Sequence, residues 1–279
     1  MSKRALFVIL SSCLPFATLL SQENNTDLGT LPQRIEIRHI ESNGVGYNQG
    51  YSTIEGFFIL APDLPRKWVP IADVRAHVFN NGKFAANAGF GLRFLSKRAW
   101  GINAYYDYRQ TCVAHYNQIG AGVETLGETL DVRLNGYLPV GTTKHAFWKK
   151  LHPVGFSHKE EFAMKGLNGE LGFHVKKFKR AYLYAAAGPY YFNNQGKNAF
   201  GGEARLRLTV CDSVRMQVSC SYDSIFKGVV QGEFGFIFPF GECKKTAPID
   251  PCQFPSVAHM RKWGLQRIDR NEIIVTDKI

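Results

Sequence analysis

The sequence alternates between apolar and polar positions, with a period of two, from about residue 51 to residue 240. The alternation comes in consecutive segments of about ten residues, separated by short connections. In one segment Ile102 and Tyr106 lie on one face, while Asn103 and Asp107 lie on the other. Successive side chains of a strand point to opposite faces of a sheet. A period of two sustained over so many segments therefore predicts an all-β fold.

The chemistry of the polar face favours a membrane barrel over a soluble β-sandwich. This face carries arginines, carboxylates and glycines, whereas the water-exposed face of a sandwich tends toward Lys, Thr and Ser. Aromatic residues, 13% of the chain, gather near segment ends, where an interfacial girdle forms. Beyond the N-terminus no stretch approaches the roughly 18 apolar residues of a spanning helix. A closed transmembrane antiparallel β-barrel is the other structure in which every backbone N–H and C=O group forms a hydrogen bond inside the membrane.

The connections between segments predict the number of strands and their orientation. Short connections at 96–98, 127–128, 177–180 and 212–213 alternate with longer ones at 110–115, 141–165 and 193–198. Bacterial barrels have short periplasmic turns and longer outer loops. Eleven clear segments would leave the N-terminus outside the cell. A twelfth strand at about residues 34–40 corrects this, so we expect a twelve-stranded barrel over residues 34–240.

The N-terminus has the pattern of an export signal. Lys3 and Arg4 precede the apolar stretch 5–20, which is too short for a stable membrane helix. We expect residues 1–21 to be a signal peptide that directs export to the outer membrane. Residues 22–33 would then form a short periplasmic segment.

Residues 241–279 break the alternation and form a separate C-terminal segment. Extended, these roughly 39 residues reach about 120 Å, several times the thickness of a membrane. The segment can therefore cross the lumen and emerge, or fold back inside as a plug. We expect a short helix at 260–268 and a short strand at 272–275.

The cysteines and the net charge limit the function classes. Without the signal peptide five cysteines remain, which allows two disulfides and one free thiol in an oxidising compartment. Their spacing does not suggest a zinc site, and we expect no metal and no cofactor.

The net charge of +11 comes from basic residues spread among carboxylates. This distribution favours anionic lipid or polysaccharide as a partner over nucleic acid. Without a hydrolase, metalloprotease or phosphate-loop motif, no enzyme activity is expected.

The polar positions of the alternating segments supply the candidate site, a network inside the lumen. Ion pairs there would hold the barrel and its C-terminal segment in place, and the alternative is a role in solute selectivity. The candidates are Asn103, Tyr105, Asp107, Arg109, Glu124, Arg133, Asn135, Arg205, Arg207 and Glu233.

Several motifs carry a family resemblance. These are residues 100–108 (WGINAYYDY), residues 120–124 (GAGVE), residues 134–139 (LNGYLP) and residues 267–275 (RIDRNEIIV). In combination and order they resemble the β-domain of the intimin and invasin family, the inverse autotransporters. The resemblance implies a twelve-stranded barrel whose C-terminal linker re-enters the lumen and leads an adhesive passenger to the cell surface. On the sequence as it stands, we expect a translocator-like barrel without a passenger, displaying its loops on the surface.

The last strand also looks like the signal that the barrel-assembly machinery reads. Glu233 and Gly235 are followed by Phe238 and Phe240, at the fifth and seventh steps beyond the polar residue. The expected partners are outer-membrane lipid, periplasmic chaperones and the assembly machinery, with a host or surface-polymer ligand left open. We expect a monomer. The alternative function is a small passive pore, with the C-terminal segment in the periplasm.

Overall fold

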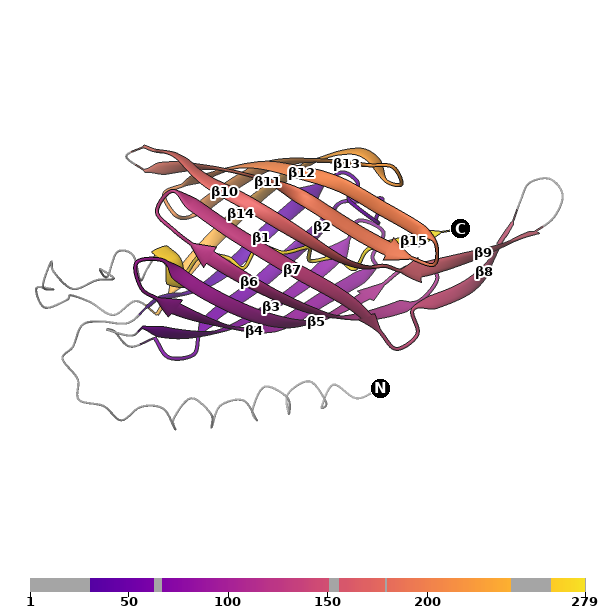
Figure 1. Ribbon diagram of the computed structural model, residues 1–279, viewed down its shortest axis with the longest axis horizontal. Coiled ribbons are helices and arrows are strands. Elements are labelled where there is room, and N and C mark those ends of the chain that lie inside the picture. The colour runs from indigo at the N-terminus through magenta and orange to yellow at the C-terminus, as the bar shows by residue number, and fades with distance from the viewer. Residues whose placement is uncertain (1–30, 63–66, 151–155, 179, 242–261, 279) are drawn as a thin grey trace, which may run out of the picture.

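The computed structural model describes residues 31–62, 67–150, 156–178, 180–241 and 262–278 (Figure 1). The strands are β1 (Gln33–Glu41), β2 (Tyr51–Ile59), β3 (Trp68–Phe79), β4 (Phe84–Leu95), β5 (Ala99–Gln110), β6 (His115–Leu126), β7 (Leu130–Val140), β8 (Lys144–Lys150), β9 (Phe156–Ala163), β10 (Lys165–Lys177), β11 (Ala181–Asn194), β12 (Lys197–Val210), β13 (Val214–Asp223), β14 (Lys227–Phe240) and β15 (Thr276–Lys278). Residues 262–264 form one helical turn. In the described part of the chain, no helix is long and apolar enough to cross a membrane.

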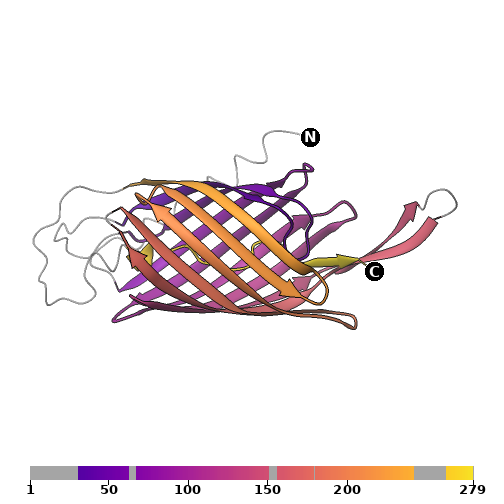
Figure 2. The same cartoon turned by 90° about the horizontal axis from the view of Figure 1, so that it is seen from above.

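Twelve strands form a closed antiparallel barrel (Figures 1 and 2). Around the barrel the order is β1-β14-β13-β12-β11-β10-β7-β6-β5-β4-β3-β2. The first and last barrel strands close the wall, with Gln33 opposite Phe240 and Glu41 opposite Gly232. The predicted twelve-stranded antiparallel barrel is therefore confirmed, including the additional strand before residue 51.

The side chains are distributed in the reverse of a soluble protein. Phe90 and Ile102 point outward and are 68% and 61% exposed, whereas Arg38 and Arg133 point inward and are 2% exposed. Alternate residues of one strand therefore face two different surroundings. An apolar exterior and a polar interior fit a barrel whose outer surface meets lipid.

The lipid-facing surface gives a first prediction. Phe90 lies near the middle of β4, whereas Phe84 lies at the end of the same strand and is 39% exposed. An arginine in the bilayer midplane costs about 2–4 kcal/mol, and one near the interface about 0–1 kcal/mol. We expect Phe90→Arg to lower the free energy of folding into lipid vesicles by the larger amount and Phe84→Arg by the smaller. Denaturant titration of vesicle-inserted protein measures both, and equal losses would contradict a membrane-embedded β4.

Two connections differ from the sequence prediction. The expected loop at 141–165 contains the hairpin of β8 and β9, which extends beyond the barrel wall (Figure 2). The expected longer connection at 193–198 is a two-residue turn, because β11 and β12 continue to it from both sides. Gln195 and Gly196 both have positive φ, 34° and 92°. Such a turn matches the twist of the flanking strands and permits the shortest hairpin.

The C-terminal elements also required correction, and the structure shows the state of three cysteines. Helical structure occurs at 262–264 rather than over 260–268, and the terminal strand is β15 rather than 272–275. Of the five cysteines, which would allow two disulfides, Cys112, Cys211 and Cys220 are free and exposed. The other two, Cys243 and Cys252, lie outside the described residues, as does the expected signal peptide.

Candidate functional site in the barrel lumen

Residues 262–278 run along the inside of the barrel from one end to the other (Figures 1 and 2). At the first end Trp263 is fully buried, and its indole N–H donates to the Gly127 carbonyl at 3.3 Å. At the far end β15 pairs with β9, so that β15, β9 and β8 form a separate three-stranded sheet. The lumen is therefore occupied along its length by the protein's own C-terminal segment.

The connections at the two ends of the barrel assign the direction of this segment. Gly127 lies in the short connection between β6 and β7, whereas β8 and β9 belong to the long connection 141–164. Short turns face the periplasm and long loops face outward in bacterial outer-membrane barrels. By this criterion the segment enters at the periplasmic end, and β15 lies at the outer end.

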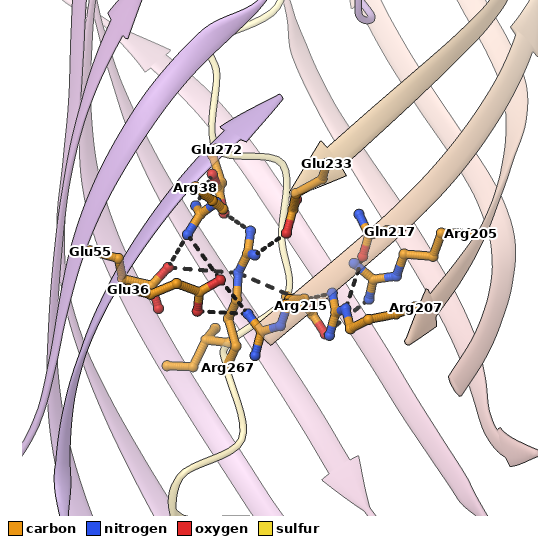
Figure 3. A network of polar contacts seen from close by, with 12 residues as sticks. Glu36, Arg38, Glu55, Arg205, Arg207, Arg215, Gln217, Glu233, Arg267 and Glu272 are labelled. Carbon is orange, nitrogen blue, oxygen red and sulfur yellow. Dashed lines mark hydrogen bonds and ion pairs between the residues drawn. The ribbon is translucent and has the colours of Figure 1, made fainter. Parts of the chain in front are cut away.

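Glu272 joins the segment to two strands of the wall. Its carboxylate lies 2.6 Å from Arg38 Nη2 (Figure 3). It also lies 2.7 Å from Arg75 Nη1. Arg267 of the same segment also pairs with Glu272, and its Nη1 atom lies 3.5 Å from Glu233 Oε1. All of these side chains are buried. Three guanidinium groups thus converge on one carboxylate that only the C-terminal segment supplies.

Asp269 has the same role on the opposite wall. Its carboxylate lies 2.9 Å from Arg205 Nη2, 2.8 Å from Arg207 Nη2 and 3.7 Å from Arg133 Nη2. Asn135 donates to its backbone carbonyl at 3.3 Å. Asp269 is 4% exposed, so these charges interact where little water screens them.

Arg270 makes the reciprocal contact, a cation of the segment on a carboxylate of the wall. Its two terminal nitrogens lie 2.6 and 2.7 Å from the two oxygens of Asp107. The guanidinium carbon also lies over two rings, 4.2 Å from the centroid of Tyr105 and 5.3 Å from that of Tyr137. This bidentate geometry is among the strongest and most specific of charged hydrogen bonds.

Apolar contacts fix the segment between these polar anchors. Trp263 and Ile268 lie in a cluster near the periplasmic end, together with Phe57. Ile273 packs in a second cluster that includes Tyr51 near the outer end. These buried apolar residues add hydrophobic stabilisation to the ion pairs.

All ten residues predicted for the lumen network point inward, and most take part in it. Glu124 lies 2.7 Å from Arg93, and the Tyr105 hydroxyl donates to Asp73 at 2.7 Å. Asn103 is buried, but its Oδ1 atom has no hydrogen-bond partner. Arg109 is outside the ion-pair network and instead donates to backbone carbonyls.

Sequence reasoning missed more than half of the network. On the wall it missed Arg34, Glu36, Arg38, Glu55, Asp73, Arg75, Arg93, Glu170 and Arg215, and on the segment Arg267, Asp269, Arg270 and Glu272. The wall residues could have been found, because the alternation in β1 puts Arg34, Glu36 and Arg38 on one face. The segment has no such alternation, so nothing in its pattern indicated where its charges point.

The proposed last-strand signal divides between the two faces of β14. Glu233 is buried in the lumen, and Gly235 packs against Arg38, where a Cβ atom would lie 2.8 Å from the Arg38 Cβ. Phe238 and Phe240 face outward and are 52% and 43% exposed. Across the described ranges, no group of three His, Cys, Asp or Glu side chains is arranged to hold a metal ion.

A closed barrel with an apolar exterior and a charged lumen defines the class, an outer-membrane β-barrel protein. Residues 74–154 match the family model described as "Inverse autotransporter, beta-domain". The match includes the motifs at 100–108, 120–124 and 134–139 and confirms the resemblance there, so the protein is an outer-membrane barrel resembling the translocator domain of inverse autotransporters. No curated protein is similar enough to this chain to count as a match.

Two solved structures share the fold. One, from work on the in-meso crystallization of membrane proteins, is 15% identical, covers 89% of this chain and 100% of its own, and has a TM-score of 0.62. The other, an outer membrane channel from Pseudomonas putida F1, is 9% identical, covers 78% of this chain and 100% of its own, and has a TM-score of 0.51. At these identities the likeness extends to the fold alone.

Proposed function

We propose that this barrel holds its own C-terminal segment in the lumen as a closed, threaded conduit and presents the end of that segment at the outer face. The observation that carries the proposal is the path of residues 262–278, from Trp263 beside the periplasmic turn to β15 on the outer hairpin. Any chain continuing beyond β15 would emerge on the outer side. This is the arrangement that a translocator-type barrel requires.

The charges of the lumen support this state over an open pore. Asp269 and Glu272 each face two or more wall arginines, and Arg270 faces Asp107. A buried charge is strongly unfavourable without a partner. If the segment were withdrawn, the wall arginines and Asp107 would lose their oppositely charged partners on the segment. They could then interact only with water or with other wall residues. A passive pore, the alternative function, would require that withdrawal.

The remaining elements of the proposal concern biogenesis and partners. The N-terminal signal pattern directs export, and the Glu233 to Phe240 pattern directs insertion by the barrel-assembly machinery with the help of periplasmic chaperones. The protein acts as a monomer without enzymatic chemistry. The β8–β9 hairpin and the other outer loops are available to a host or surface-polymer ligand.

A disulfide between the segment and the outer hairpin tests the threading. Ala163 of β9 lies opposite Thr276 of β15, and its N–H donates to Thr143 on the other side. The two residues therefore form a non-hydrogen-bonded pair, whose Cα atoms lie about 4.5 Å apart. This separation is within disulfide range. We expect Ala163→Cys with Thr276→Cys to form a disulfide in intact cells, identified as a linked peptide by mass spectrometry.

A matched control places the second cysteine at the other end of the segment. Ala163→Cys combined with Gly264→Cys should remain unlinked, because Gly264 lies near Trp263 at the periplasmic end. An epitope tag after residue 279 should also be accessible to antibody on intact cells. A tag protected until the membrane is broken, with no disulfide formed, would refute the threaded state and favour the pore.

A further inference from the structure

The outer end of the lumen contains a cavity of about 280 Å³ that the network of ion pairs does not fill. Its lining comes from the loop 42–50, the end of β3 and the turn after it, the end of β5 and the turn after it, Glu161 of β9, Phe226 between β13 and β14, and β15. Because β15 contributes Thr276, Asp277 and Lys278, the complete cavity exists only while the segment is threaded. Its volume is just below the range of drug-sized ligand pockets, so it suits a smaller molecule.

Arg109, which lines this cavity, differs from the other arginines of the lumen. Its side chain is 7% exposed, and among the described residues it has no carboxylate within 4.0 Å. Its Nη1 atom donates to the carbonyls of Gly46 and Ile274. The Nε atom is buried without a hydrogen-bond partner. A buried guanidinium with spare donors is a strong attractor for an anion, because an unpaired buried charge is costly.

A second cation without an acidic partner lines the same cavity. Lys83, in the turn between β3 and β4, makes no side-chain ion pair with any described residue. The two carboxylates of the cavity are already paired, Glu161 with Lys278 at 3.2 Å and Asp277 with Lys197 at 2.7 Å. The uncompensated charges that remain at the cavity are therefore both positive.

The neutral lining adds the features that recognise a sugar. The rings of Tyr47, Phe79 and Phe226 line the cavity; Tyr47 and Phe79 are largely buried with the Arg109 guanidinium over both, so Phe226 offers the more accessible apolar surface to a pyranose. Asn81 and Gln49 supply amide groups, and the Oε1 atom of Gln49 is buried without a hydrogen-bond partner. An aromatic side chain, a spare amide oxygen and an uncompensated positive charge together suit a polyhydroxylated ring that carries an acid.

We propose that this cavity binds an acidic sugar unit of a surface glycan, with its carboxylate or phosphate at Arg109 and Lys83 and its ring against the aromatic side chains. The proposal rests on the threaded state, since β15 forms part of the wall. It adds a function: a bound glycan favours the threaded state, because a ligand stabilises the only conformation that binds it. The carboxylated and the phosphorylated sugar share one recognition chemistry.

Isothermal titration calorimetry of the full-length protein in an uncharged detergent tests the site. The probes are glucuronic acid, glucose 6-phosphate, glucose and inorganic phosphate. We expect at least one acidic sugar to bind at least tenfold more tightly than both glucose and inorganic phosphate. Tighter glucuronic acid would indicate a carboxylated polymer, and tighter glucose 6-phosphate would indicate a phosphorylated glycolipid headgroup. Acidic sugars that bind no better than glucose, or no better than inorganic phosphate, would overturn the proposal.

Variants distinguish the site from general attraction to a basic protein. Lys83→Gln removes a charge that has no contact with the segment, and we expect it to weaken acidic-sugar binding about tenfold, the loss of one charge-assisted hydrogen bond. Arg109→Gln should weaken it further. Lys97→Gln, the same change on an exposed turn at the periplasmic end, should leave the affinity unchanged. Equal affinities for Lys83→Gln and Lys97→Gln would refute the site. If the disulfide between Ala163→Cys and Thr276→Cys forms but no acidic sugar binds, the sugar-binding proposal is refuted and the threaded conduit is still supported.

Discussion

Asp269→Asn is expected to release the C-terminal segment from the barrel wall and to open a conducting pore. The substitution keeps the size of the side chain but removes the negative charge that faces Arg205, Arg207 and Arg133. Breaking a buried ion pair by removing one partner costs about 3–5 kcal/mol, because the remaining charge stays buried and unpaired. Arg207 would lose the only carboxylate that pairs with it among the described residues, whereas Arg133 and Arg205 would still pair with Glu170, so we expect a loss within that range.

Two measurements test the expected opening of the pore and the expected loss of stability. Single-channel recording in planar bilayers should show a nearly silent wild-type protein and frequent openings for Asp269→Asn. Denaturant unfolding of the refolded barrel should show the lower stability. Asp212→Asn is the matched control, because Asp212 is an exposed turn residue with a φ of 55°, a conformation that asparagine also tolerates. Equal conductance for the two variants would mean that Asp269 does not hold the segment in the lumen.

Arg270→Gln and Asp107→Asn should each destabilise the protein strongly, yet the double variant should lose much less than the sum. Each single change leaves one buried charge of a bidentate pair without its partner, at a cost of about 3–5 kcal/mol. The double variant removes both charges, so no unpaired charge remains buried. A double-mutant cycle on the free energy of unfolding should therefore give a coupling of about 0.5–3 kcal/mol.

A second cycle provides the comparison for this coupling. Arg270→Gln combined with Asp223→Asn pairs the segment residue with a buried acid that instead accepts a hydrogen bond from Tyr190. Residues without shared partners are additive within about 0.3–0.5 kcal/mol. If the Asp107 cycle were as additive as the Asp223 cycle, the direct contact between the segment and the wall would be refuted.

The barrel itself could be predicted because its strands obey a local rule. In β5, lipid and lumen impose opposite polarities on adjacent residues, so Ile102 and Asn103 reveal their faces without knowledge of any partner. The same rule identified Asp107, Arg133, Arg205 and Glu233 as lumen residues. The strand number came from the connections as well, because a twelfth strand is needed to keep the N-terminus on the side of the short turns.

Local rules failed where a residue's environment is set by distant parts of the chain. The sequence predicts a longer loop where the structure has the turn Gln195–Gly196, because nothing local shows that β11 and β12 continue to it. It predicts a loop in place of the hairpin of β8 and β9, because the hairpin lies outside the membrane, where lipid imposes no alternation. It predicts an ion pair for Arg109, whose partners are the carbonyls of Gly46 and Ile274.

The sequence by itself determined the class of the protein, its strand number and the face on which each wall residue lies, because the contrast between lipid and lumen is recorded at every second position. Only the tertiary structure decided what fills the lumen. Asp269, Arg270 and Glu272 lie in a segment without periodicity, and their partners come from strands far away in the sequence. Long-range charge pairing depends on which side chains meet inside the closed barrel, and no local pattern along the chain reveals which ones meet.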